Sequence, residues 1–127
     1  MRPNIRDLSP HTPGLDERAG EEKLVLLDGN ESPYNNPLNR YPDPLQRHLR
    51  REVARAKQVQ EESVFLSNGS DEAIDLTFRI FCTPGRDNVV AMAPTYGMYK
   101  ARADINDVGY RTVPLDERYQ MSAKRML

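Results

Sequence analysis

One turn in the sequence could bind an anion, because a glycine there precedes the start of a predicted helix. The turn is Gly69-Ser70-Asp71-Glu72. The glycine permits a tight turn, and Ser70 is expected to cap the helix, whose first N–H groups form the positive end of a dipole. Such a turn suits phosphate, although an ordinary N-cap followed by acidic residues gives the same pattern. The glycines of a dinucleotide fingerprint and the Gly-Lys-Ser/Thr of a Walker loop are absent.

A second candidate is an aromatic residue in a loop that follows a predicted strand. Tyr96 lies between Pro94 and Gly97, just after the apolar segment 88–92. Ligands of open α/β sheets bind at the carboxyl ends of parallel strands, so the Tyr96 ring could stack on a flat ligand. Alternatively, Tyr96 and Tyr99 are amphipathic residues at the rim of the fold.

Metal and lysine chemistry find little support in the sequence. His11 and His48 are far apart, and no His and Cys spacing predicts a metal site. No lysine lies in an apolar, Gly/Ser-rich setting that would depress its pKa. The lysines are Lys23, Lys57, Lys100 and Lys124. We therefore expect no metal centre and no catalytic lysine in this chain.

Alternating strands and helices must position the two candidate loops. The predicted strands are 64–66, 88–92 and 110–113. The predicted helices are 73–81, entered through the turn 67–72, and 97–103. The order βαβαβ is typical of a mostly parallel sheet covered by helices. Apolar residues cover more than one face of the helix 73–81, which is therefore expected to pack on two sides. Cys82 is expected to be a small buried hydrophobe.

The N-terminal part differs from the rest of the chain in its composition. Seven of the ten prolines lie in the first 44 residues. This richness in proline predicts an extended arm, residues 1–42, that lies on another part of the protein. One apolar run, Leu24–Leu27, is a strand candidate within it. Residues 43–127 are expected to form the α/β portion.

A basic helix is predicted to begin at Asp43 and Pro44. Asp43 suits the N-cap, and Pro44 suits the first helical position, which needs no N–H. The apolar stripe of this helix is Leu45, Leu49, Val53 and Ala56, and its arginines are Arg47, Arg50, Arg51 and Arg55. The arginines form either a solvated face or a site for an anion or partner. No aromatic residues interleave with them, so base stacking has no support.

Composition narrows the class of protein. The 127 residues suffice for about one domain, and the net charge of −1 favours neither nucleic acid nor an anionic membrane. A single cysteine excludes an intramolecular disulfide. The sequence has no long apolar run and no N-terminal signal pattern, which predicts a soluble cytoplasmic protein.

Five stretches, taken together in this order and spacing, resemble one known family. They are Leu27–Pro33, Arg40–Asp43, Gly69–Asp75, Arg79–Asn88 and Pro94–Tyr99. They resemble the histidinol-phosphate aminotransferases, which are fold-type I enzymes that use pyridoxal 5'-phosphate. The resemblance covers nearly the whole chain. It implies an α/β fold in which the N-terminal arm precedes the first βαβαβ portion of the large domain.

The resemblance also implies roles for single residues. Ser70 and Asp71 would hold the cofactor phosphate at the helix N-terminus, and Tyr96 would stack on the pyridine ring. Tyr41 would reach the cofactor phosphate of the neighbouring subunit of a homodimer, and Asn30 would lie near the substrate. The substrates implied are histidinol phosphate and 2-oxoglutarate, in histidine biosynthesis.

The sequence departs from the family pattern in two ways. An early Pro-Tyr motif is replaced by Ser9-Pro10-His11. The family's ring-tuning asparagine and aspartate, Schiff-base lysine and carboxylate-binding arginine have no counterparts here. The resemblance therefore implies that the chain is about the first third of such an enzyme and is inactive alone.

Three other functions are compatible with parts of the pattern. The parent protein could be another fold-type I enzyme, such as an aromatic aminotransferase or a threonine-phosphate decarboxylase. The chain could instead be a non-catalytic truncated protein that binds phosphate weakly or associates with a partner. A nucleic-acid-binding basic helix is the third, and the net charge of −1 argues against it.

Overall fold

The chain forms two compact units in the computed structural model, which describes residues 1–9, 29–34, 36 and 38–126. One unit combines Met1–Leu8 with the chain from Ser67 onward, and the other spans Ser9–Leu66. The strand candidate Leu24–Leu27, Pro10-His11 and Lys23 lie outside the described residues.

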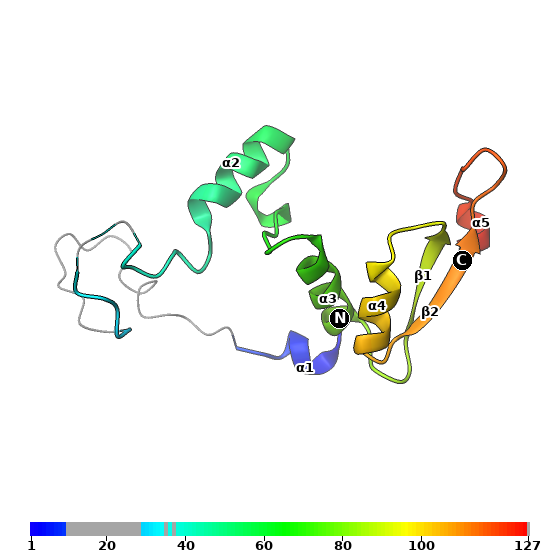
Figure 1. Cartoon of the computed structure of the whole chain (residues 1–127), viewed down its shortest axis with the longest axis horizontal. Coiled ribbons are helices and arrows are strands. Elements are labelled where there is room, and N and C mark those ends of the chain that lie inside the picture. Colours follow the sequence, from blue (N-terminus) through cyan, green and yellow to red (C-terminus); the bar gives the residue numbers. More distant parts are fainter. Residues whose placement is uncertain (10–28, 35, 37, 127) are drawn as a thin grey trace. The chain divides into compact units, whose positions relative to one another are not determined.

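A parallel two-stranded sheet is the centre of the first unit (Figure 1). Strand β1 (Asn88–Ala93) pairs with β2 (Gly109–Pro114), in a register that runs from Asn88 opposite Gly109 to Ala93 opposite Pro114. Parallel neighbours need a crossover, and helix α4 (Met98–Ile105) supplies it. The predicted strands 88–92 and 110–113 are confirmed, as is the helix between them, which ends two residues later than expected.

The core of this unit lies between the helices and the sheet. Helix α3 (Ser70–Phe81) contributes Phe78, which packs with Ala103 of α4 and with Val108. Cys82, predicted to be buried, is half-buried against this cluster, and this burial raises the pKa of its thiol. Phe81, the last residue of α3, is 55% exposed, so its side chain has no such second packing surface within the described residues.

The first residues of the chain lie at the C-terminal end of α3. Helix α1 (Pro3–Arg6) is a single turn. The backbone N–H of Arg2 donates to the carbonyl of Ile80 at 2.8 Å, and its guanidinium donates to the carbonyl of Arg79 at 2.9 Å. The last carbonyls of a helix have no acceptor role within it, so Arg2 satisfies two of them. A further short helix, α5 (Ala123–Met126), ends the described chain.

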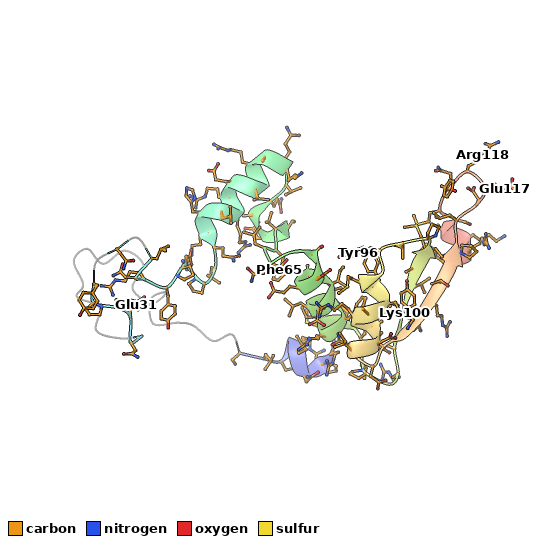
Figure 2. The ribbon with its side chains drawn as sticks, viewed as in Figure 1. Glu31, Phe65, Tyr96, Lys100, Glu117 and Arg118 are labelled. Carbon is orange, nitrogen blue, oxygen red and sulfur yellow. The ribbon has the colours of Figure 1, made fainter. Side chains whose placement is uncertain are left out.

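The strand predicted at 64–66 is not formed. These residues have no strand assignment, and Phe65 is 67% exposed (Figure 2). A strand of three residues is stabilised only by pairing with a neighbour. No neighbour pairs with it among the described residues, where β1 and β2 are the two strands of the sheet.

The second unit contains helix α2 (Arg47–Lys57) and a 3₁₀ turn, η1 (Glu61–Ser63). The helix was predicted to begin at Asp43 and Pro44 but begins at Arg47, because a turn closed by the side chain of Asp43 comes first. Its carboxylate accepts the N–H groups of Leu45 at 3.0 Å and of Arg47 at 2.9 Å. Gln46 then takes a left-handed conformation with φ 51° before the helix starts.

The arginines of α2 have protein partners. Arg47 pairs with Asp43 at 3.0 Å and Arg51 with Glu61 at 3.1 Å, and Arg55 pairs with Glu52. Arg50 donates to the carbonyl of Glu61 at 2.7 Å. These pairs favour the solvated face over an anion site, because each guanidinium already has an acceptor.

Candidate active site

The N-terminus of α3 is built on a glycine conformation. Gly69 occupies the N-cap position with φ 85° and ψ 167°, and Ser70 is the first helical residue. The prediction that Ser70 caps the helix is therefore wrong by one position, and no side chain caps it. The reason is the backbone: this region of φ and ψ is essentially restricted to glycine.

Two side-chain hydrogen bonds, from Ser67 and to Glu72, stabilise the turn that precedes α3. The carboxylate of Glu72 accepts the N–H of Asn68 at 2.5 Å, and the Ser67 hydroxyl donates to the carbonyl of Gly69 at 2.9 Å. A β-carbon at Gly69 would meet nothing within 4 Å. The first N–H groups of a helix lack acceptors within it. They have no side-chain cap here, and Gly69 beside them borders open space, which leaves room for a phosphate.

The structure brings together Asp71 and Tyr96, two of the predicted cofactor residues. The Tyr96 hydroxyl donates to Asp71 Oδ1 at 3.2 Å, and this hydrogen bond raises the pKa of the Tyr96 phenol. Tyr96 lies between β1 and α4 and is 53% exposed. Its ring meets Tyr99 edge-on, with centroids 6.2 Å apart. The contact joins the loop after β1 to the first turn of α3.

Asn30 and Tyr41 lie together in the second unit. Both line a pocket of about 230 Å³, together with Glu31, Ser32, Leu38, Asn39 and Arg40. The predicted site residues thus form two pairs, Asp71 with Tyr96 and Asn30 with Tyr41, and the pairs belong to different units.

Glu31 is a residue of this pocket to which sequence reasoning gave no role. Its side chain, labelled in Figure 2, is 4% exposed. It accepts the backbone N–H of Tyr41 at 2.7 Å and pairs with Arg40 at 2.6 Å. The hydrogen bond from Arg40 is the main cause that lowers the Glu31 pKa. The available signal was an acidic residue beside Asn30 and an Arg-Tyr pair ten positions later.

The described lysines lie on the surface. Lys100 pairs with Asp104 one turn along α4, at 2.6 Å (Figure 2). Lys57 and Lys124 are exposed. In the part of the chain that the structure describes, no three His, Cys, Asp or Glu side chains converge on a possible metal position. Nor does any described helix have the length and apolar character to cross a membrane.

The sequence of this chain is similar to a known protein family and to several curated proteins. Residues 23–127 match the family described as aminotransferase class I and II. A histidinol-phosphate aminotransferase of Bacteroides fragilis is 57% identical over 126 residues, and one of Bacteroides thetaiotaomicron is 55% identical. Each match covers 99% of this chain and 36% of the relative.

A more distant relative shows the same coverage. The histidinol-phosphate aminotransferase of Parabacteroides distasonis is 50% identical over 127 residues, which is all of this chain and 36% of that protein. The chain thus spans little more than a third of the length of the curated relatives it matches. Because the family match extends over most of its residues, the chain belongs to the aminotransferase class I and II family.

Proposed function

We propose that this chain is the N-terminal part of a histidinol-phosphate transaminase. The enzyme would move an amino group between histidinol phosphate and 2-oxoglutarate, giving imidazole-acetol phosphate and glutamate. The observation that carries this proposal is the identity of 50–57% to enzymes of that name over essentially the whole chain. The chain covers 36% of each relative, so the substrate is proposed for the whole enzyme of which this chain would be a part.

The first turn of α3 would hold the phosphate of pyridoxal 5'-phosphate. The helix start at Ser70 and Asp71 without a side-chain cap, and the glycine conformation at Gly69 with open space beside it, support this role. A helix N-terminus favours a dianion by hydrogen bonding and by its dipole. When bound, the cofactor supplies an electron sink for the bond that breaks at the substrate α-carbon.

Tyr96 would orient the cofactor ring. Its hydroxyl is held by Asp71, which follows the proposed phosphate-binding residue Ser70. One hydrogen bond therefore couples the position of the stacking ring to the position of the phosphate anchor. The groups that contact the phosphate and the ring are thus held in place relative to each other before the cofactor binds. Less conformational entropy of the protein is then lost on binding.

The second pair would serve the substrate side. Asn30 would lie near the bound substrate, and Tyr41 would reach the cofactor phosphate of the partner subunit in a homodimer. Both residues line one pocket, which supports a shared role. We also propose a cytoplasmic location, and small molecules rather than nucleic acid or membrane as ligands.

The proton-transferring lysine would come from the remainder of the protein. A transaminase needs a lysine with a neutral amine beside the cofactor. The described lysines are exposed, and Lys100 is paired with Asp104. The isolated chain is therefore proposed to have no aminotransferase activity of its own.

The test is an assay of the full-length gene product. Purified protein, loaded with cofactor, is given histidinol phosphate and 2-oxoglutarate, and glutamate formation is followed. The expected result is a kcat/KM for histidinol phosphate at least ~100-fold above that for phenylalanine or tyrosine, because a site built for a phosphate strongly rejects amines that lack one. Equal or better use of the aromatic amino acids would replace the proposal by an aromatic aminotransferase. Release of carbon dioxide from threonine phosphate would replace it by a decarboxylase.

A further inference from the structure

Glu31 joins the two ends of the segment that carries Asn30 and Tyr41. Its Oε1 accepts the N–H of Tyr41, and its Oε2 accepts the guanidinium of Arg40, ten and nine positions away. A second link runs beside it, since the Asn39 side-chain amide donates to the carbonyl of Ser32 at 3.2 Å. The segment is therefore a closed loop, with the Glu31 carboxylate at its neck.

The turn that precedes Glu31 lies against Tyr41. Gly29 has φ 71° and Asn30 has φ 49°. A β-carbon on Gly29 would stand 3.8 Å from two ring carbons of Tyr41 and 3.6 Å from Cγ of Glu31, which is ordinary van der Waals contact. The Tyr41 ring is thus bounded by the Gly29 turn, while its backbone is bonded to Glu31.

We propose that Glu31 is a positioning residue that sets where Tyr41 presents its hydroxyl and where Asn30 stands beside it. The inference rests on the proposed function, because it concerns the same site. Tyr41 is 65% exposed, so apart from the Gly29 turn little packing holds its ring. The bond from its N–H to Glu31 fixes the backbone from which the ring projects. The ion pair with Arg40 keeps the carboxylate ionised and aimed at the Tyr41 N–H.

The chemistry of the carboxylate makes the role specific to an acidic residue. Both partners of Glu31 are donors, and an ionised carboxylate offers two acceptor oxygens. A glutamine in the same position has one acceptor oxygen and one donor group, so one of the two partners loses its bond. Glu31→Gln therefore loosens the loop without changing the size of the side chain.

The first experiment measures cofactor binding in the full-length protein by equilibrium dialysis of pyridoxal phosphate. Glu31→Gln is expected to weaken binding roughly tenfold, the range expected for loss of a charged hydrogen bond. Tyr41→Phe should also weaken binding. The double variant Glu31→Gln with Tyr41→Phe should bind the cofactor as well as whichever single variant binds it more weakly. The effects of two residues on binding do not add when one acts through the other.

A matched control makes the same chemical change elsewhere. Glu52→Gln breaks the exposed pair with Arg55 on α2 and should leave cofactor binding unchanged. Thermal unfolding of each variant shows whether it is folded. Fully additive losses for Glu31→Gln and Tyr41→Phe, or unchanged binding in Glu31→Gln, would overturn the positioning role.

A second readout is independent of cofactor and activity. With ¹⁵N-labelled tyrosine, the amide signal of Tyr41 should report the titration of the Glu31 carboxylate that it contacts. The midpoint should lie below that of an ordinary glutamate, because the hydrogen bonds that Glu31 accepts from Arg40 and Tyr41 lower its pKa. The titration should vanish in Glu31→Gln. An amide that titrates equally in both proteins would refute the bond itself. A wild-type protein without transaminase activity but with this titration would refute only the proposed function.

Discussion

The hydroxyl of Tyr96 and the carboxylate of Asp71 meet at 3.2 Å across 25 positions of sequence. This contact ties the loop after β1 to the helix start at Gly69, two segments that carry different parts of the proposed cofactor site. It also separates two functions of one side chain, because the ring offers a stacking face while the hydroxyl fixes the ring's position.

The two functions of Tyr96 can be measured separately. Tyr96→Ala removes the ring and is expected to weaken cofactor binding in the full-length protein by roughly threefold to tenfold, the value of a stacked aromatic pair. Tyr96→Phe keeps the ring and loses the hydrogen bond to Asp71, so its loss should be smaller. Cofactor dissociation constants from fluorescence titration give the comparison, and equal constants for the two variants would count against stacking.

The Tyr96 phenol should titrate late. The hydrogen bond to Asp71 stabilises the protonated phenol and raises its pKa. The folded protein therefore holds this proton more tightly than the unfolded chain does. The resulting stabilisation is fully present below the phenol's unfolded pKa, about 10, and is lost as the pH rises through the higher folded value. Difference absorbance against Tyr96→Phe isolates this phenol, and Asp71→Asn should move its midpoint down.

Ser70 offers a way to remove one proposed phosphate donor without breaking the helix. Ser70 is the first residue of α3, and proline is well accommodated at that position. Ser70→Pro should thus leave α3 intact while deleting one N–H, and cofactor binding should weaken roughly tenfold. Ser70→Ala keeps the N–H and serves as the control. If dialysis finds equal binding by the folded proline and alanine variants, the N–H of residue 70 holds no phosphate.

Much of the α/β order could be predicted from sequence because its determinants are local. Strand β1 coincides with a short apolar run, β2 with a short segment of strand-favouring residues, and α4 follows a loop that contains Pro94 and Gly97. The segment 64–66 looks equally apolar, yet a strand depends on a partner far along the chain, and local composition does not supply one. The helix starts were displaced because Asp43 and Gly69 organise turns that come before the first helical residue.

The site residues show the same division between local and distant determinants. The turn at Gly69 and the exposed ring of Tyr96 are visible in short motifs. The bonds that connect Tyr96 to Asp71 and Glu31 to Tyr41 span 25 and ten positions. Each depends on how the intervening backbone turns, and for Glu31 the polar side chain alone carries no sign of its burial.

Two glycines that precede helices should respond to the same substitution to different degrees. Gly69 has φ 85° and ψ 167°, where a β-carbon costs about 1–3 kcal/mol through backbone strain. Gly97 precedes α4 with φ −63° and ψ −21°, and a β-carbon there meets nothing within 4 Å. Gly69→Ala should lower the free energy of unfolding in urea, whereas Gly97→Ala should change it by less than about 1 kcal/mol. Similar losses in both would show that the conformation at Gly69 is not the one described.

The chain alone should form no specific covalent adduct with pyridoxal phosphate. A lysine reacts selectively with the cofactor aldehyde when its surroundings favour the neutral amine. Lys100 is the described lysine nearest in sequence to Tyr96, but its ammonium is held by Asp104 at 2.6 Å and its side chain is 61% exposed. Its amine is thus engaged in an ion pair on the surface and is not set in a pocket beside the cofactor aldehyde. We expect borohydride reduction of the purified chain with cofactor to give scattered, substoichiometric labelling. Mass spectrometry that finds one fully labelled lysine, together with turnover of histidinol phosphate, would contradict the assignment of the catalytic lysine to the rest of the protein.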